Sequence, residues 1–385
     1  MAKKHKPRSG SLAFYPRKRA LRETPSFSST PTVTVAEGET SKPITFLGYK
    51  VGMTHILGKD AHEKGATAGQ EVNIPVTVIE TPPLKVFGIR AYAKSDKSYG
   101  LAASFDVLAE KPDKSLLKKI TNFKKKSGKK DKKETTKAKT LSDLDAAKEK
   151  LVSIVLLAHT QPGLCGFGKK RPDIMEVTLS GNVEQQITYA KEVLGKDVVI
   201  GDAFDELEFI DVKAVDKGKG MQGVVKRFGV KVHRPKAKKR RVVGSIGPWN
   251  PSTVMWTVAR PGQMGYQTRT ECNKKILRLG ENGEGINPAS GFTKYGVVKN
   301  NYVILAGSIP GPSKRVIALR KHNRKLPGEK HKIEGIDFIA TRPETGKNLA
   351  TDEKLLHKVE IEKEKKVEKK SVADEIQAAV KGEKK

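Results

Sequence analysis

A long basic segment with almost no acidic counterpart constrains the fold of this chain more than any other feature. Between Lys217 and Arg278 there are sixteen Lys or Arg residues and a single acid, Glu271. Few of its apolar residues follow a regular period, so the segment cannot bury a core that offsets the entropy lost on ordering it. Glycine, proline and aromatic residues alternate with the bases and permit tight turns. This basic segment, residues 217–278, therefore predicts an extended loop whose contacts a partner supplies, with an ordinary solvated hairpin as the alternative.

The rest of the chain points to the same kind of partner. Its 385 residues include 75 Lys or Arg and 43 Asp or Glu, a formal net charge of +32. Such an excess attracts polyanions, of which nucleic acid is the leading class. RNA offers phosphates to the bases and unstacked nucleobases to the aromatic rings. The longest apolar runs, such as residues 154–158, are far shorter than the ~20 residues of a spanning helix, so no membrane span is predicted.

Outside the basic segment the sequence predicts short strands. Runs of β-branched and aromatic residues, punctuated by Gly and Pro, occupy 44–57, 72–93, 207–215 and 295–321. Each is too short to bury a core alone. We therefore expect a mainly β fold in which one discontinuous β-barrel, residues 44–107 and 196–350, is interrupted by an inserted α/β domain, residues 108–195, and by the basic segment.

The two ends of the chain differ in composition from the predicted domains. Residues 1–43 are rich in Lys, Arg, Ser, Thr and Pro and lack the apolar stretch of a secretory signal. We name them the N-terminal arm and expect an extension that orders against a partner, with a solvated tail as the alternative. The composition of residues 351–385 predicts a charged C-terminal tail with many pairs of oppositely charged side chains at i,i+4 spacing.

The two tryptophans suggest different roles. Trp256 lies in an alternating apolar stretch, TVMWTVA, which predicts a packed strand residue. Trp249 lies in GPWNP, where Pro and Gly prevent regular structure, which favours an exposed contact.

Motifs for catalysis are weak. GKGMQG, residues 218–223, matches G-x-G-x-x-G, but no helical pattern follows and Arg240 stands where a dinucleotide site needs an acid. His159 and Cys165 lack a third partner, and a buried thiol is the commoner situation. The acids at 202–208 predict a turn entering a strand, with paired catalytic carboxylates as the alternative. The two cysteines and eight histidines form no metal-ligand pattern, so we expect no metal, no cofactor and no small-molecule substrate.

Several long stretches together resemble a known family. They are FLGYKVGMTHI, VIETPPLKVFGIRAY, AVDKGKGMQGVVKRFGV, GSIGPWNPSTVMWTVARPGQMGYQTRTECNKKI and GFTKYGVVKNNYVILAGSIPGPSKRVIALR. From about residue 4 to about residue 350 the chain resembles the universal large-subunit ribosomal protein number three, in its archaeal and eukaryotic branch.

The resemblance implies a fold and a function. The fold would be a translation-protein-type β-barrel with an inserted α/β domain, an extended N-terminal arm and a long basic finger. The function would be that of a non-enzymatic constituent of the cytoplasmic large ribosomal subunit, which binds near the 3′ end of the large rRNA, helps nucleate assembly and extends the finger toward the peptidyl transferase centre. The implied partners are large-subunit rRNA and neighbouring large-subunit ribosomal proteins. The rivals are a free basic RNA-processing or RNA-modifying enzyme and a general nucleic-acid-coating protein.

The candidate rRNA-binding residues are mainly the bases of the N-terminal arm and the basic segment. By the resemblance, Trp249 matches the tryptophan at the finger tip and the bases at 236–241 match its stem. Ala237 stands where eukaryotic members have a histidine, so no modification of that histidine is implied. The candidates are Lys3, Lys4, Lys6, Arg8, Arg17, Lys18, Arg19, Lys217, Lys219, Lys226, Arg227, His233, Arg234, Lys236, Lys238, Lys239, Arg240, Arg241, Trp249, Arg260, Arg269, Lys274, Lys275 and Arg278.

Overall fold

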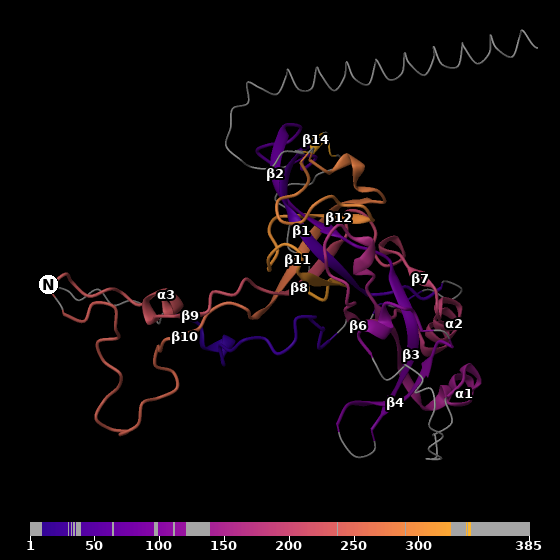
Figure 1. Ribbon diagram of the computed structural model, residues 1–385, viewed down its shortest axis with the longest axis horizontal. Helices are drawn as coiled ribbons and strands as arrows, with labels where there is room; N and C mark the ends of the chain where they lie inside the picture. Colours follow the sequence, from indigo (N-terminus) through magenta and orange to yellow (C-terminus); the bar gives the residue numbers. More distant parts are fainter. Residues whose placement is uncertain are drawn as a thin grey trace, which may run out of the picture. The chain divides into compact units, whose positions relative to one another are not determined.

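A computed structural model describes most of residues 10–324 (Figure 1). Within that range it leaves out positions 30, 32, 34, 36–39, 64, 96–98, 111, 121–138, 237 and 289, and beyond it describes 336, 338 and 339. The described residues belong to one compact unit, residues 1–342. The predicted C-terminal tail, Lys3, Lys4, Lys6, Arg8 and Ala237 lie outside the described residues.

The larger sheet has seven antiparallel strands. Their order is β13 (Val316–Lys321), β8 (Phe209–Val215), β11 (Thr268–Gly280), β12 (Tyr302–Ala306), β2 (Glu71–Glu80), β1 (Thr45–Lys59) and β14 (Phe338–Ile339). The first part of β1 also pairs with β13, with Tyr49 opposite Val316, so the path of hydrogen bonds closes on itself. A register shift between Lys50 and Gly52 lets β1 pass from β13 to β2, because a bulge bends its strand.

The second sheet contains five strands. Its order is β4 (Leu101–Leu108), β3 (Leu84–Lys94), β5 (Leu151–His159) and β6 (Ile174–Thr178), and the short β7 (Asp197–Val198) pairs with the start of β3. The sequence assigned residues 44–107 to the barrel. Within that range, β3 and the part of β4 up to residue 107 pair in this second sheet instead of in the larger one. Thr81-Pro82-Pro83 separates β2 from β3, and since proline has no N–H for a ladder, the chain changes sheets there.

Helices are few and short in the described part of the chain. The helix α2 (Val183–Val193) is amphipathic and buries Ile187 and Ala190 on one face, and Gln186 Oε1 accepts a hydrogen bond of 2.9 Å from Ile154 N on β5. The other α-helices are α1 (Leu141–Ala146) and α3 (Val224–Phe228), and β9 (Met221–Gln222) pairs with β10 (Gly262–Gln263). Short 3₁₀ turns are η1 (Leu12–Phe14), η2 (Leu116–Lys118), η4 (Lys148–Lys150), η5 (Pro162–Leu164), η6 (Ile200–Asp202) and η7 (Gly283–Gly285). The expectation of a mainly β fold is confirmed.

The two sheets share one hydrophobic core. Phe46 and Tyr49 of β1 belong to the same buried cluster as Ile154 and Leu156 of β5. Tyr49 also joins the sheets by polar contacts, because its hydroxyl lies 2.8 Å from Thr160 Oγ1 and donates to Asp173 Oδ2 at 2.9 Å. The core thus fixes the larger sheet, from whose strands β8 and β11 the basic segment departs.

Candidate nucleic-acid interface

The basic segment leaves the larger sheet as a two-limbed root. From the end of β8 to the start of β11 the limbs stay antiparallel: Asp216 N donates to Gln267 O at 2.9 Å and Met264 N donates to Gly220 O at 2.8 Å. Figure 1 shows β9, α3 and β10 beyond the ends of β8 and β11. Gly265 allows this close pairing, because its φ is +71° and a Cβ would lie 2.2 Å from Lys217 O.

A helix follows GKGMQG, contrary to the sequence-based expectation. The α3 helix spans only five residues, buries Val224 and Phe228, and ends at Gly229, whose φ of 68° is left-handed. Five residues are too few to display a 3.6-residue period, which is why the sequence pattern missed it. Arg240 still stands in place of the acid that would bind a ribose.

The N-terminal arm packs against this root. Arg17 Nη1 donates to Arg227 O at 2.9 Å, and Arg227 Nη2 donates to Arg17 O at 3.1 Å. The Arg17 guanidinium also lies over the Phe228 ring, 4.2 Å from its centroid. Ala20 N donates to Tyr266 O at 2.8 Å. The arm and the basic segment, whose two arginines are 210 residues apart in sequence, therefore form one structure at this point.

Trp256 is not the packed strand residue that the sequence predicted. It lies in a turn and is 65% exposed. One side of its ring meets the Tyr15 ring edge-on, with centroids 5.2 Å apart. The alternating stretch TVMWTVA has no described strand beside it to pair with, and its tryptophan instead contacts the arm.

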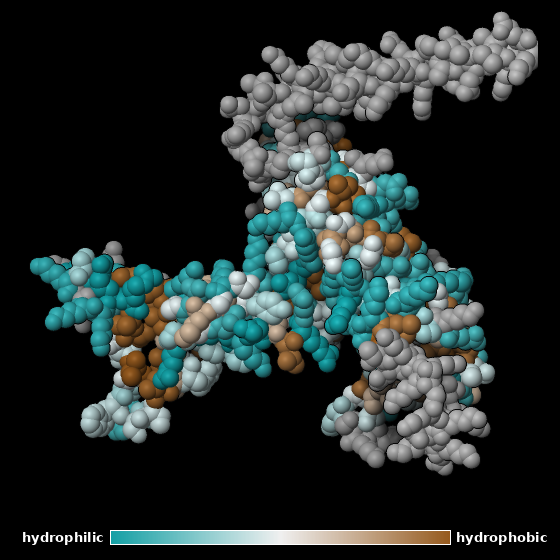
Figure 2. All heavy atoms as spheres, viewed as in Figure 1, coloured by the Kyte–Doolittle hydropathy of each residue, from teal (hydrophilic) through white to brown (hydrophobic). Residues whose placement is uncertain are grey.

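The loop between α3 and β10 displays its bases. Trp249 is 92% exposed, and Figure 2 shows hydrophobic side chains beside hydrophilic ones in this part of the chain. The backbone of His233 supports the loop, because its N–H donates to Arg240 O at 3.0 Å. Fifteen predicted site residues are exposed: Lys18, Arg19, Lys217, Lys219, Lys226, His233, Arg234, Lys236, Lys238, Lys239, Arg240, Arg241, Trp249, Arg260 and Arg278.

The other five described site residues are half-buried and engaged within the chain. They include Arg17 and Arg227 of the root. Lys274 Nζ lies 2.9 Å from Glu271 Oε2, Lys275 lies over the Phe209 ring at 5.9 Å, and Arg269 lies over the Phe14 ring at 5.2 Å. Three of these, Arg269, Lys274 and Lys275, belong to β11, so the basic segment is part of the sheet from Thr268 onward.

Further cations surround the root, and sequence reasoning missed them. Lys50 is buried on β1 and donates to Ile309 O at 2.6 Å. Burial, and secondly the charge of Lys217, lower the pKa of Lys50 to about 8. Arg315 pairs with Glu23 of the arm at 3.0 Å. Lys50 stands alone in a strand-like run and Arg315 has only Lys314 beside it, so no dense cluster of charges marks either residue.

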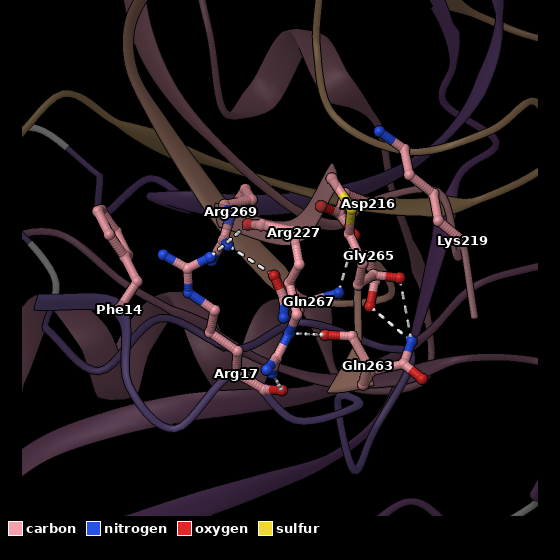
Figure 3. A pocket seen from close by; sticks show the side chains of 10 residues that line it. Phe14, Arg17, Asp216, Lys219, Arg227, Gln263, Gly265, Gln267 and Arg269 are labelled. Atoms are coloured by element: carbon pink, nitrogen blue, oxygen red, sulfur yellow. Dashed lines mark hydrogen bonds between the residues drawn. The ribbon is translucent and has the colours of Figure 1, made fainter. Parts of the chain in front are cut away.

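A cavity of about 230 Å³ opens where arm and root meet (Figure 3). Phe14 and Arg17 reach it from the arm, Asp216 and Lys219 from one limb of the root, and Gln267 and Arg269 from the other. With Arg227, four cations therefore line a cavity that has one carboxylate. Arg269 Nη2 donates to Gln267 Oε1 at 2.8 Å, while Gln267 Nε2 has no hydrogen-bond partner among the described residues.

The histidine and cysteine considered for catalysis lie in structural contacts. The ring Nδ1 of buried His159 lies 3.0 Å from Thr160 O. Cys165 lies beside Asn300, whose Nδ2 is 3.8 Å from its sulfur, and burial raises the pKa of its thiol. A thiol with a raised pKa is a poor nucleophile, which argues against the catalytic alternative.

The acids at 202–208 also serve the fold. Glu206 accepts a hydrogen bond from Leu279 N at 2.7 Å, and Glu208 lies 3.3 Å from Lys321 Nζ. In the described ranges we find no cluster of potential metal ligands. No helix there has the length and apolar character to span a bilayer.

Comparison with known proteins assigns the chain to a family. The profile of the family described as "Ribosomal protein L3" matches residues 1–346. The chain belongs to the ribosomal protein L3 family. A relative from Methanocaldococcus jannaschii, "Large ribosomal subunit protein uL3", is 45% identical over 348 residues, which cover 89% of this chain and 98% of that protein. Proteins of the same name from Methanobrevibacter smithii and Methanococcus vannielii are 44% and 46% identical, over 90% and 89% of this chain and 100% and 99% of theirs.

Membership of the L3 family confirms the resemblance read from the sequence. The matched range, residues 1–346, includes the arm, both sheets and the whole basic segment. Every described candidate site residue therefore lies within the part of the chain that this L3-family profile spans.

Proposed function

We propose that this L3-family chain is a structural component of the large ribosomal subunit and binds large-subunit rRNA through its arm and basic segment. One observation carries the proposal: the loop between α3 and β10 exposes all eight of its Lys and Arg residues, with no acid between positions 217 and 270. Like charges displayed this densely repel one another, and rRNA phosphates neutralise them with release of counterions.

The detailed role follows the family. In this proposal the closed larger sheet is the translation-protein-type barrel, the second sheet with α2 is the inserted domain, and the basic segment is the finger. The chain binds near the 3′ end of the large rRNA, helps nucleate assembly, and directs Trp249 toward the peptidyl transferase centre. It acts in the cytoplasm without cofactor or substrate, beside neighbouring ribosomal proteins. The exposure of Trp249 supports its role as a contact at the tip.

In this proposal, the chain recognises large-subunit rRNA by the folded structure of the RNA and not by its base sequence. An A-form RNA helix hides its base edges in a deep major groove, so a protein recognises its shape, its 2′-hydroxyls and its single-stranded junctions. A root paired by backbone hydrogen bonds and a loop held by few internal contacts suit this task. The root sets the direction of the segment, and folded rRNA supplies the remaining order.

Sedimentation of the native protein from a lysate tests the proposal. We expect co-migration with the large subunit that persists in moderate salt and is lost after ribonuclease digestion. Migration as a free 42.2 kDa protein would overturn it. Binding of a nucleotide at GKGMQG would then favour the RNA-processing enzyme, and equal affinity for random duplex would favour a general coating protein.

A further inference from the structure

The cavity between arm and root carries an inference beyond general phosphate binding. None of its four cations has an acidic partner among the described residues. The hydrogen bonds of Arg17 and Arg227 go to backbone carbonyls, which are neutral. Those of Arg269 go to Thr268 O and Gln267 Oε1, which are also neutral. The side chain of Lys219 is exposed and has no hydrogen bond or ion pair there. Burial, and then the nearby charge of Arg17, lower the pKa of Arg227. The wall that Arg17 and Arg227 form is thus set up for an anion, and Lys219 adds a cation, unpaired in the described chain, on the other side of the cavity.

Asp216 is the one acidic residue among the described residues that line the cavity. Its Oδ1 accepts a hydrogen bond of 2.8 Å from Gln267 N, and no ion pair with a described residue neutralises its carboxylate. A carboxylate repels a phosphate but accepts hydrogen bonds from the exocyclic amino group of a nucleobase. Figure 3 shows Asp216 and Lys219 on the side of the cavity away from Phe14 and Arg17. The cavity therefore presents an anion site and an amino-group site together.

The cavity is small. A volume of about 230 Å³ is below the roughly 300–1,000 Å³ of pockets that hold complete small-molecule cofactors. Phe14, with Arg269 over its ring at 5.2 Å, adds a flat cation–aromatic wall of the kind on which unstacked bases lie. Gln267 Nε2 is a donor still without a partner in the described chain, which a base carbonyl or ring nitrogen would satisfy.

We propose that this cavity holds one unstacked nucleotide of rRNA whose base carries an exocyclic amino group. The cations hold its phosphate, with Lys219 as the adjustable member, and Asp216 accepts from the amino group. Adenine, cytosine and guanine carry such a group, whereas uracil presents a carbonyl oxygen there. The inference rests on the proposed rRNA-binding function, and it adds a discrete site at which the arm completes the wall.

Met264, which lines the cavity, provides a local probe. The full chain, freed of RNA and labelled at its six methionine methyl groups, would be titrated with the four nucleoside 5′-monophosphates and with inorganic phosphate. We expect the Met264 signal to shift while that of Met175, buried in β6, stays in place. Uridine monophosphate should bind about tenfold more weakly than cytidine monophosphate, the factor that one hydrogen bond to a charged acceptor supplies.

Two variants and a control identify the groups. Asp216→Asn keeps an acceptor for Gln267 N but removes the charge, so the preference for cytidine over uridine monophosphate should vanish. Lys219→Gln should weaken all four nucleotides together. Lys150→Gln removes an exposed base of η4 that lies outside the arm, the basic segment and the cavity lining, and it should change neither. Equal binding of all nucleotides and phosphate by the wild-type chain would overturn base recognition, and an immobile Met264 signal would overturn the site.

The source of the nucleotide is tested in assembled subunits. Chemical probing of Watson–Crick edges in large subunits carrying Asp216→Asn should reveal one nucleotide that is protected with the wild-type chain and with Lys150→Gln. No newly reactive nucleotide, in subunits that assemble normally, would overturn the assignment to rRNA and point to a free nucleotide. Failure of the proposed function would look different, because the wild-type chain itself would then not co-sediment with the subunit.

Discussion

Gly265 shows how one residue controls the root of the basic segment. Its φ is +71°, and a side chain has no room there because a Cβ would lie 2.2 Å from Lys217 O. We expect Gly265→Ala to cost about 1–3 kcal/mol, because it combines backbone strain with a clash against backbone. Limited proteolysis should then cut within residues 217–267 faster than in the wild-type chain. Gly223→Ala, whose added carbon would meet open space, is the matched control and should cut at the wild-type rate.

Trp249 tests the proposed tip. Because its side chain is 92% exposed, Trp249→Ala should change the free energy of unfolding by no more than about 0.5 kcal/mol. In ribosomes it should alter tRNA accommodation or sensitivity to drugs at the peptidyl transferase centre. Trp256→Ala provides the contrast, since it removes a ring contact with Tyr15 and should loosen the arm. Wild-type translation and drug sensitivity with Trp249→Ala would contradict the proposed position of the tip.

The lowered pKa of Lys50 predicts that the stability of the fold depends on pH. Its pKa is about 8 in the folded chain and 10.5 ordinarily, so between these values the unfolded state binds more protons than the folded state. Stability linked to this group therefore rises as pH increases from about 8 to about 10.5. Urea unfolding across that range should show the wild-type chain gaining stability relative to Lys50→Met. A constant difference between the two chains would mean that Lys50 titrates normally in the fold.

At the scale of elements, the exposed stem of the loop is expected to act through charge. Replacing Lys238, Lys239, Arg240 and Arg241 with Gln should make the slope of log K against log salt for rRNA binding shallower by about 0.7 to 0.9 for each phosphate that is no longer neutralised. A variant that exchanges Lys for Arg and Arg for Lys at these positions keeps the charge and should keep the slope. An unchanged slope in the neutral variant would place these bases in solvent.

The elements also show where sequence patterns are informative. Strands of the core and helix α2 could be predicted, because burial on one face imposes a period that the sequence must carry. The α3 helix and the turn around Trp256 could not. The α3 helix has only five residues, and the ring of Trp256 contacts Tyr15, a residue of the arm that is remote in sequence. The candidate site was predicted as a set of bases, but its division into exposed and engaged bases was not.

At the scale of the whole molecule, the two sheets should unfold together. Tyr49→Phe removes hydrogen bonds to Asp173 and Thr160 that cross between them, and we expect a loss of about 1–3 kcal/mol. Tyr92→Phe is the control, because its hydroxyl donates to Glu176 at 3.0 Å at the surface of one sheet, and it should cost less. Thermal unfolding should show one transition that shifts for Tyr49→Phe. Two transitions, of which only one shifts, would show that the sheets unfold independently.

The sequence by itself determined the mainly β class, the family, and the need of a basic segment for a polyanionic partner. Composition and local periodicity suffice for the class and the partner, because they reflect burial and net charge. Only the tertiary structure decided that β3 and β4 join the second sheet, that Arg17 and Arg227 bind each other's backbone, and that arm and root enclose a cavity. Such contacts depend on the free energy of bringing distant segments together, which no local pattern of residues encodes.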